Sequence, residues 1–398
     1  MKKIALVLPE VYPVPAVLGG AVEELVTILI EQNEIEQKAE FIVFSMANEA
    51  AEEKAKEYKH TKIVFIQKTS FGDRLVNRVL RYTNPLVKGK TLIDIAYYRR
   101  VFAYLKEHPV DAIVAEGGLY HEFHRFAEEF GKEKIYLHIH HHLLCEPYID
   151  HLYGGVIGIS GFATKEWMRT TEDKTVRPYT VYNCVNEDKF TKRITNEERA
   201  ALRAEFGFTP KDTVVMYCGR ILEVKGAKEL VQAVINLNNP HIKLLMIGSA
   251  VSGGNAATPY VAKVQKLVEE AGERVKFTGY IDNKELYRYY QSADMQVIPS
   301  LWEEAAGLIA IEGMLSGLPL IVTKSGGLVE YATADTAIQI DRENVVANLE
   351  KAIRELAEDI TKREQMREAS LKKAKEFPKS RFYNSFVEVF EYEGNGKK

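Results

Sequence analysis

The chain has 398 residues, enough for two domains of about 150–200 residues each. Its hydrophobic content of 46% and charged content of 27% are those of an ordinary globular protein. The formal net charge of −3 excludes a strongly basic balance, so we expect no nucleic-acid partner. The three cysteines, Cys145, Cys184 and Cys218, are far apart and form no C-x-x-C pair. This spacing argues against a disulfide framework or a zinc site and fits a reducing compartment.

The first apolar segment, Ile4–Leu8, looks like the first half of a signal peptide. Glu10 interrupts the apolar run, and Pro13 and Pro15 follow it, so we interpret the segment as the first buried strand. No apolar run approaches the roughly 18 residues that a membrane-spanning helix needs. We therefore expect a cytoplasmic protein.

Apolar, strand-like runs alternate with amphipathic helical stretches along the whole chain, which indicates βα units and parallel sheets. In the first half we predict strands at Ile4–Leu8, Phe41–Phe44, Ile63–Ile66, Ala112–Val114, Ile135–Ile139 and Val156–Ile159. In the second half we predict strands at Val214–Tyr217, Lys243–Ile247, Val275–Phe277, Met295–Ile298, Pro319–Val322 and Ala337–Ile340. A polar, charged gap from Asn186 to Asp212 separates the two series and indicates two domains. The tail, Glu343 to Glu391, is predicted to be helical, with a break at Phe377-Pro378.

Residues 68–90 combine basic and apolar residues. The basic residues are Arg74, Arg78, Arg81, Lys88 and Lys90, against a single acid, Asp73. Arg74, Arg78 and Arg81 fall on one face of a helix. Such a helix either has an ordinary solvated face or lies on an anionic membrane surface.

Four histidines lie within five positions at the end of the fifth predicted strand: His138, His140, His141 and His142. In a continuing strand, His138, His140 and His142 would share one face, which is a geometry that could bind a metal ion. A purely structural role for most of the cluster is the alternative.

A strand–loop–helix–strand unit occupies residues 295–322. The strand Met295–Ile298 ends at Pro299, a short loop carries Glu304, and a helix predicted to start near Ala306 contains Glu312. Gly317 and Pro319 end that helix. Ligands of open α/β sheets bind at the carboxyl ends of the strands, and a helix N-terminus attracts anions. Two carboxylates beside an anion site predict a ligand with both phosphate and hydroxyl groups, such as a sugar nucleotide.

This unit resembles the E-x7-E signature of the retaining glycosyltransferases of family four, whose consensus reads P-S-x-x-E-x-x-G-x-x-x-x-E-A-M-A-x-G-x-P. Gly313 in place of alanine and Leu315-Ser316 after Met314 are mild departures. The resemblance implies the GT-B fold, an α/β architecture of two Rossmann-like domains with parallel sheets facing across a cleft. It implies an acceptor domain at 1–184, completed by a returning C-terminal helix at 378–398, and a donor domain at 185–377.

Two further segments of the second half resemble the family. Residues 219–226 resemble its G-R-x-x-x-x-K-G segment, and residues 276–282 resemble an F-x-G segment that precedes E-L-x-x-x-Y, here assigned to Glu285, Leu286 and Tyr289. The resemblance implies that Arg220 and Lys225, beside Gly219, stabilise the charge of a leaving nucleoside diphosphate. It also implies the remaining donor contacts: the nucleobase at the backbone of Tyr280 and Ile281, a ribose at Glu312, the transferred sugar at Glu304, and phosphate at the N–H groups of Ala306, Gly307 and Leu308.

In the first half, the pair Gly19-Gly20 resembles the loop with which these enzymes cover the donor phosphates, although a glycine pair before a helix is also a common turn. Its spacing matches neither G-x-G-x-x-G nor a Walker sequence. His140 aligns best with the single histidine that the family places near the reacting carbon. Glu116-Gly117-Gly118, after the preceding strand, are candidates for the same region.

The resemblance implies retaining, metal-independent transfer, and the absence of a D-x-D triplet agrees with a site that needs no metal and no cofactor. Glu304 and Glu312 are assigned to the donor, so no carboxylate nucleophile is left and we expect a front-face displacement. The expected donor is a UDP-linked hexose or N-acetylhexosamine, with a GDP-sugar as the alternative. The expected acceptor is a saccharide or a lipid-linked saccharide in bacterial surface polysaccharide or lipopolysaccharide synthesis, with the enzyme on the inner membrane face. Alternative functions are a nucleotide-sugar epimerase and a catalytically idle structural or coat protein with the same fold.

Overall fold

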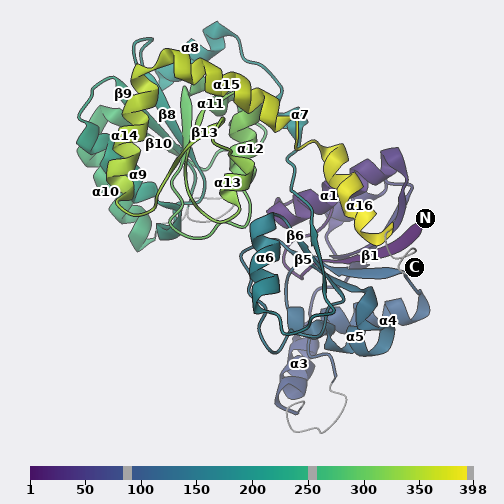
Figure 1. The fold of residues 1–398 in the computed structure, drawn as a ribbon. Coiled ribbons are helices and arrows are strands. Elements are labelled where there is room, and N and C mark those ends of the chain that lie inside the picture. The colour runs from purple at the N-terminus through teal and green to yellow at the C-terminus, as the bar shows by residue number, and fades with distance from the viewer. Residues whose placement is uncertain (84–91, 250–257, 392–398) are drawn as a thin grey trace. The chain divides into compact units, whose positions relative to one another are not determined.

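The computed structural model describes residues 1–83, 92–249 and 258–391 (Figure 1). The chain divides into two compact units, Met1–Asn183 with Lys379–Lys398 and Cys184–Pro378. Each unit contains one parallel β-sheet with helices packed on it, which confirms the predicted α/β class with two Rossmann-like domains. The prediction that the two sheets face each other across a cleft stays a prediction.

The sheet of the first unit has the strand order β3-β2-β1-β4-β5-β6-β7, and all neighbouring strands run parallel. The strands are β1 (Lys2–Val7), β2 (Ala39–Met46), β3 (Thr61–Ile66), β4 (Ala112–Ala115), β5 (Ile135–Ile139), β6 (Gly155–Gly158) and β7 (Arg177–Thr180). Six of them match the predicted strands. The edge strand β7 was missed because its sequence, Arg-Pro-Tyr-Thr, has no apolar run and no fully buried residue.

The helices of the first unit are α1 (Ala21–Glu36), α2 (Glu49–Ala55), α3 (Phe71–Thr83), α4 (Ala96–Glu107), α5 (His124–Phe130), α6 (Gly161–Thr170) and α16 (Lys379–Glu391), with short 3-10 turns at Tyr120–Phe123 and Lys132–Lys134. Among the described residues, no helix has both the length and the apolar character needed to cross a membrane. Of the predicted basic segment, residues 84–90 with Lys88 and Lys90 lie outside the described residues.

The C-terminal helix α16 belongs to the first unit and packs beside α1 (Figure 1). Its apolar residues Phe382, Phe386 and Phe390 are buried. The hydroxyl of Tyr383 donates to Asn33 Oδ1 at 2.6 Å and accepts the N–H of Lys38 at 3.0 Å. The helical spacing of the aromatic residues therefore gives α16 its apolar face. The buried Tyr383 also anchors α16 to residues near the N-terminus through hydrogen bonds.

The sheet of the second unit has the order β10-β9-β8-β11-β12-β13, again with all neighbours parallel. Its strands are β8 (Thr213–Cys218), β9 (Ile242–Ile247), β10 (Val275–Gly279), β11 (Met295–Ile298), β12 (Leu320–Thr323) and β13 (Ala337–Ile340). All six correspond to predicted strands. Most of their residues are buried, which explains their nearly continuous apolar sequences, because helices cover both faces of a parallel sheet.

The helices of the second unit are α7 (Glu187–Phe190), α8 (Asn196–Glu205), α9 (Ala227–Leu237), α10 (Pro259–Ala271), α11 (Leu286–Ser292), α12 (Leu308–Leu315), α13 (Leu328–Tyr331), α14 (Val345–Glu358) and α15 (Ile360–Ala374), with 3-10 turns at Glu223–Lys225 and Gly272–Arg274. The predicted polar gap thus contains two helices. The helix α8 begins with a capping box formed by Thr195 and Glu198, a local start signal that the sequence does contain.

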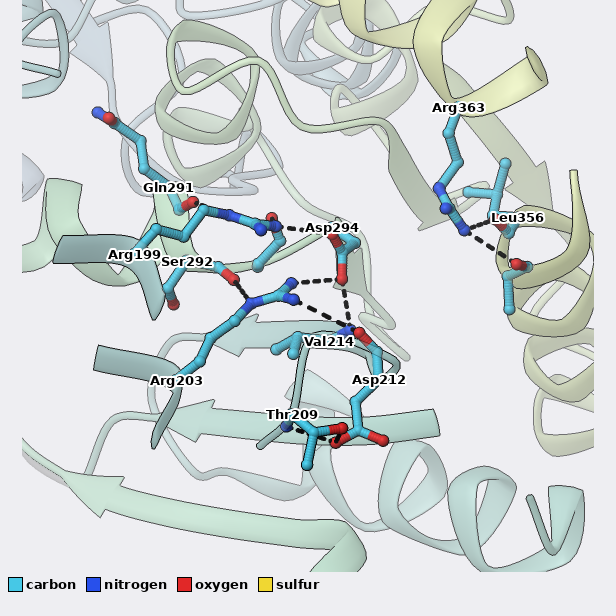
Figure 2. Close-up of polar contacts among 12 residues, drawn as sticks. Arg199, Arg203, Thr209, Asp212, Val214, Gln291, Ser292, Asp294, Leu356 and Arg363 are labelled. Atoms are coloured by element: carbon cyan, nitrogen blue, oxygen red, sulfur yellow. Dashed lines mark hydrogen bonds and ion pairs between the residues drawn. The ribbon is translucent and has the colours of Figure 1, made fainter. Parts of the chain in front are cut away.

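An arginine network closes the amino-terminal edge of the second sheet (Figure 2). Asp294 accepts hydrogen bonds from the guanidinium groups of Arg199 and Arg203 and from the N–H of Val214. The same two arginines donate to the carbonyls of Gln291 and Ser292 at the C-terminal end of α11. Cations at a helix C-terminus are favoured by the helix dipole, so this network ties α8 to the start of the sheet.

In each sheet the strand order reverses between two neighbouring strands, β1 and β4 in the first unit and β8 and β11 in the second. At such a switch point the loops after the two strands leave in opposite directions and open a crevice at the carboxyl edge. The loops after β8 and β11 carry the residues singled out in the second half of the sequence.

Candidate active site

Lys225 and Glu304 lie in contact at the switch point of the second sheet. Lys225 ends the 3-10 turn after β8, Glu304 follows β11, and the Lys225 Nζ to Glu304 Oε1 distance is 2.6 Å. The hydroxyl of Ser300 also donates to this carboxylate, and the Lys225 ammonium lies 4.9 Å from the ring centroid of Trp302. Both charged side chains keep some exposure, 20% for Lys225 and 14% for Glu304. The arrangement provides a cation and a carboxylate side by side at the carboxyl edge.

Gly226 explains how the two loops approach each other. It has a φ of 69°, and a Cβ atom there would lie 2.0 Å from the carbonyl oxygen of Pro299. The N–H of Leu301 donates to the carbonyl of Val224 at 2.8 Å, which fixes the contact. A side chain at residue 226 would therefore separate Lys225 from Glu304.

Glu312 lies within α12, whose first residue is Leu308, two residues after the predicted start. The hydroxyl of Tyr290 donates to Glu312 Oε2 at 2.7 Å, and Cys218 at the end of β8 lies beside both groups. Part of Glu312 is accessible to solvent, but its carboxyl group is surrounded by protein. Burial raises the pKa of Glu312 to about 7, against the opposing effect of the Tyr290 hydrogen bond.

The aromatic partner of Glu312 corrects one sequence assignment. Tyr289, which we assigned to the E-L-x-x-x-Y segment, packs against Phe206 with a ring separation of 6.3 Å. The next residue, Tyr290, is the one fully buried beside Glu312. Counted from Glu285, the last position of that segment is residue 290, so the spacing contained the correct assignment.

The loops after β8 and β9 also touch closely. Gly248 has a φ of 148°, and a Cβ atom there would lie 1.8 Å from the carbonyl oxygen of Gly219. Arg220, the next residue, is exposed, and its guanidinium makes no hydrogen bond or ion pair within the described residues. Arg220 is therefore available to an anionic ligand at this edge, whereas Lys225 is already paired with Glu304.

The remaining predicted donor residues also follow strand ends or begin helices. Tyr280 and Ile281 come directly after β10, and Tyr280 is 43% exposed. Ala306 and Gly307 precede α12, and Leu308 begins it, so their N–H groups lie at a helix N-terminus. In the first unit, Gly19 and Gly20 have positive φ angles, and Gly20 directly precedes α1.

The histidines after β5 do not act as one group. His138 Nδ1 and His140 Nε2 lie 2.9 and 2.8 Å from Glu116 Oε2, at the end of β4. His142 instead lies 3.5 Å from Glu166. The predicted face shared by His138, His140 and His142 is therefore wrong for His142, because β5 ends at Ile139.

Burial and charge set the protonation of this group. Burial alone would raise the pKa of Glu116, but the imidazole of His138 and hydrogen bonds from both histidines outweigh it and lower the pKa to about 2. Burial, together with the neighbouring His138, lowers the pKa of His140 to about 4. His140 is therefore a neutral imidazole at pH 7, held by an ionised carboxylate.

A pocket of about 390 Å³ lies at the opposite, amino-terminal edge of the second sheet. Arginines that line it donate to carbonyls at the C-terminal ends of three helices: Arg193 to Leu315 of α12, Arg199 to Gln291 of α11, and Arg363 to Leu356 of α14. Helix capping accounts for this polar lining. We assign it no ligand.

Comparison with known proteins agrees with this geometry. Residues 198–373 match the family model described as glycosyl transferases group 1. The chain is 32% identical over 153 residues to spore coat protein SA of Bacillus subtilis (strain 168), covering 37% of this chain and 40% of that protein. It is 35% identical over 150 residues to a D-inositol 3-phosphate glycosyltransferase of Mycobacterium sp. (strain KMS), covering 37% of this chain and 32% of that protein.

The chain thus spans two fifths or less of these curated relatives. A crystal structure of Anabaena Alr3699/HepE in complex with UDP and glucose superposes with a TM-score of 0.70 at 17% identity, over 98% of this chain and all of that one. At this identity the likeness establishes the fold, which is GT-B. The family match covers residues 198–373, which lie within the second unit.

Proposed function

We propose that this protein is a glycosyltransferase that moves a sugar from a nucleotide sugar to a saccharide or lipid-linked acceptor. The observation that carries the proposal is the Lys225–Glu304 contact at the switch point of the second sheet, in the loop that leads into α12, with Glu312 one turn into that helix. A sugar nucleotide needs cations and N–H groups for its diphosphate and carboxylates for its hydroxyls. This edge offers both kinds of group.

Each residue then has a distinct task. Arg220, the helix N-terminus and Lys225 meet the diphosphate, on which negative charge increases as the sugar departs. Glu304 orients a hydroxyl of the transferred sugar and shares Lys225 with the phosphate. Glu312 accepts hydrogen bonds from the ribose, with Tyr290 holding its other oxygen. The backbone at Tyr280 and Ile281 meets the base, and Gly19 and Gly20 cover the phosphates.

The finer features follow from the resemblance and are part of the proposal. The transfer retains the anomeric configuration through a front-face displacement, because both glutamates bind the donor and neither serves as a nucleophile. The diphosphate is neutralised without a metal ion. His140 orients the reacting sugar in the first unit. The donor is a UDP-hexose or UDP-N-acetylhexosamine, and the acceptor belongs to a bacterial surface polysaccharide or lipopolysaccharide.

A second candidate function is that of a structural protein that kept the fold. It is suggested by the presence of spore coat protein SA among the relatives. Incubation with UDP-glucose, UDP-N-acetylglucosamine and GDP-mannose distinguishes the two. A transferase releases the nucleoside diphosphate slowly even without an acceptor, and Lys225→Ala and Glu304→Gln abolish the release. A structural protein releases none from any donor, and an epimerase would convert the sugar without releasing the diphosphate.

We also propose that α3 contacts an anionic membrane. The helix presents its apolar residues outward: Phe71, Leu75, Val79 and Tyr82 are 86%, 57%, 54% and 74% exposed. Arg74, Arg78 and Arg81 are also exposed on the same helix. Its polar side faces the protein instead, since the buried amide of Asn77 accepts hydrogen bonds from Ala96 and Arg99. Apolar side chains flanked by arginine match the interface of an anionic bilayer.

Sedimentation with lipid vesicles tests this contact. The wild type should bind vesicles that contain phosphatidylglycerol but should not bind neutral phosphatidylcholine vesicles. Added salt should weaken the binding. Leu75→Ser with Val79→Ser should abolish binding, whereas the exposed Ile360→Ser on α15 should leave it unchanged. Equal binding of both variants, or no binding of the wild type, would refute a membrane contact through α3.

A further inference from the structure

Glu116, His138 and His140 form a compact buried cluster in the first unit. Their side chains are 0%, 1% and 6% exposed. One nitrogen of each imidazole and one carboxylate oxygen lie within 4.8 Å of one another. The strand register produces this meeting: Ala115 of β4 pairs with Leu137 of β5, so the next residues, Glu116 and His138, stand side by side. His140 reaches the same side because side chains two positions apart point the same way.

The cluster carries a charge that needs a cation. The ion pairs of Glu116 within the described residues are those with the two imidazoles, and no lysine or arginine there reaches its carboxylate. A buried carboxylate is costly unless a nearby positive charge compensates it. In addition, Glu116 Oε1, His138 Nε2 and His140 Nδ1 are buried without a hydrogen-bond partner in the described structure. Either an extra proton or a metal ion must balance the carboxylate.

We propose that Glu116 Oε2, His138 Nδ1 and His140 Nε2 bind a divalent transition-metal ion, best matched by zinc. Two histidines and one glutamate are a known ligand set for zinc with an open fourth position. Bonds of about 2.0–2.2 Å in tetrahedral geometry place ligand atoms about 3.4 Å apart. The present separations of 2.9 and 2.8 Å would therefore have to widen by about half an ångström. A metal ion at these three atoms would supply the cation that the buried Glu116 carboxylate otherwise lacks.

The proposed metal ligands belong to the first unit, whereas Lys225, Glu304 and Glu312 belong to the second. The proposal does not rest on any transfer activity, because bound metal is measured directly.

The test counts zinc in the full chain. Protein freed of metal by a chelator is equilibrated with zinc chloride, desalted and analysed by mass spectrometry. The wild type should retain about one zinc ion per chain, and Glu116→Gln and His138→Gln should lose nearly all of it. His142→Gln is the matched control and should retain the ion, because His142 faces Glu166. No retained zinc in the wild type, or unchanged zinc in Glu116→Gln, would overturn the proposal.

A second measurement covers the case in which the buried variants fail to fold, as judged by circular dichroism. X-ray absorption of the zinc-loaded wild type should give nitrogen and oxygen ligands at about 2.0–2.2 Å with imidazole scattering. A sulfur shell at about 2.3 Å would assign the metal to cysteine and refute this site. Nucleotide binding is measured on the same samples, and it should depend on Glu312 and not on Glu116 or His138. Failure of the metal proposal therefore leaves the proposed nucleotide site untouched, and the reverse also holds.

Discussion

The carboxyl group of Glu312 should link the proposed nucleotide binding to pH. Its pKa of about 7 means that near neutral pH a large part of the free protein carries a protonated Glu312. A ribose hydroxyl donates to the ionised form, so ligand binding favours loss of that proton. We expect the affinity for UDP-glucose, whose diphosphate does not titrate near neutrality, to rise between about pH 6 and pH 8. Calorimetric titrations across this range test it, and a flat profile would contradict it.

The same carboxyl group lowers stability as the pH rises. Its native pKa of about 7 exceeds the ordinary 4.5, so the native state binds more protons than the unfolded chain between these values. Unfolding free energy therefore falls as the pH rises through this window. Glu312→Gln should be more stable than the wild type at about pH 8, by on the order of 2 kcal/mol, and no more stable at about pH 4. Urea unfolding at both pH values measures the difference, and an equal effect at both would exclude titration of Glu312 as its cause.

Gly226 tests whether the two loops depend on close backbone contact. Gly226→Ala should disrupt the Lys225–Glu304 contact and remove nucleotide binding, because its Cβ would overlap the Pro299 carbonyl at 2.0 Å. Gly207→Ala is the control: Gly207 has a similar φ of 73°, but the nearest atom to its Cβ is 3.9 Å away. It should lose about 1 kcal/mol of stability from backbone strain and keep nucleotide affinity. Equal nucleotide affinity in the two variants would show that the steric contact is unimportant.

At the residue scale, sequence reasoning reached the groups that sit in motifs but not their partners. The E-x7-E spacing identifies Glu304 and Glu312 but does not show that Lys225 lies against Glu304, or that Tyr290 and Cys218 lie beside Glu312. Such contacts depend on tertiary packing and leave no local spacing to count. Glu116 was noted only as part of a loop, and its pairing with two histidines became visible once β4 and β5 were known to be neighbours.

At the scale of elements, α16 should be held to the first unit by Tyr383. Tyr383→Phe removes two hydrogen bonds and leaves Asn33 Oδ1 and the Lys38 N–H without this partner. We expect a loss of about 1–3 kcal/mol in unfolding free energy, measured with urea. Tyr82→Phe on α3, with an exposed ring, is the control and should change stability little. Matching losses in the two variants would contradict an anchoring role for Tyr383.

The elements that sequence predicted well are those with continuous apolar runs. Central strands such as β8 and β12 are buried on both faces, so hydrophobicity alone locates them. The edge strand β7 is half exposed and contains proline, so the same signal is missing. The helix α8 was not predicted because its sequence is mostly polar. Only one side of this surface helix packs on the core, so few of its residues are apolar.

At the scale of the whole molecule, two Rossmann-like units share one chain, and the final helix returns to the first unit. The order β10-β9-β8-β11-β12-β13 places the loops after β8 and β11 at one switch point, and this topology gives the second unit its ligand edge. Binding of a nucleotide-sugar donor at this edge of the second unit is the central claim of the proposed function.

Calorimetric titration of the full chain tests that claim most directly. The ligands are UDP, GDP, ADP and dTDP, and the buffer contains a chelator. One nucleotide, which we expect to be UDP, should bind without metal, and Glu312→Ala and Lys225→Ala should each weaken it by about tenfold or more. Lys228→Ala, an exposed lysine one turn further along, should bind as the wild type does. If no nucleotide binds, or if the Glu312 and Lys225 variants bind as well as the wild type, the second unit does not hold a nucleotide-sugar donor at these residues.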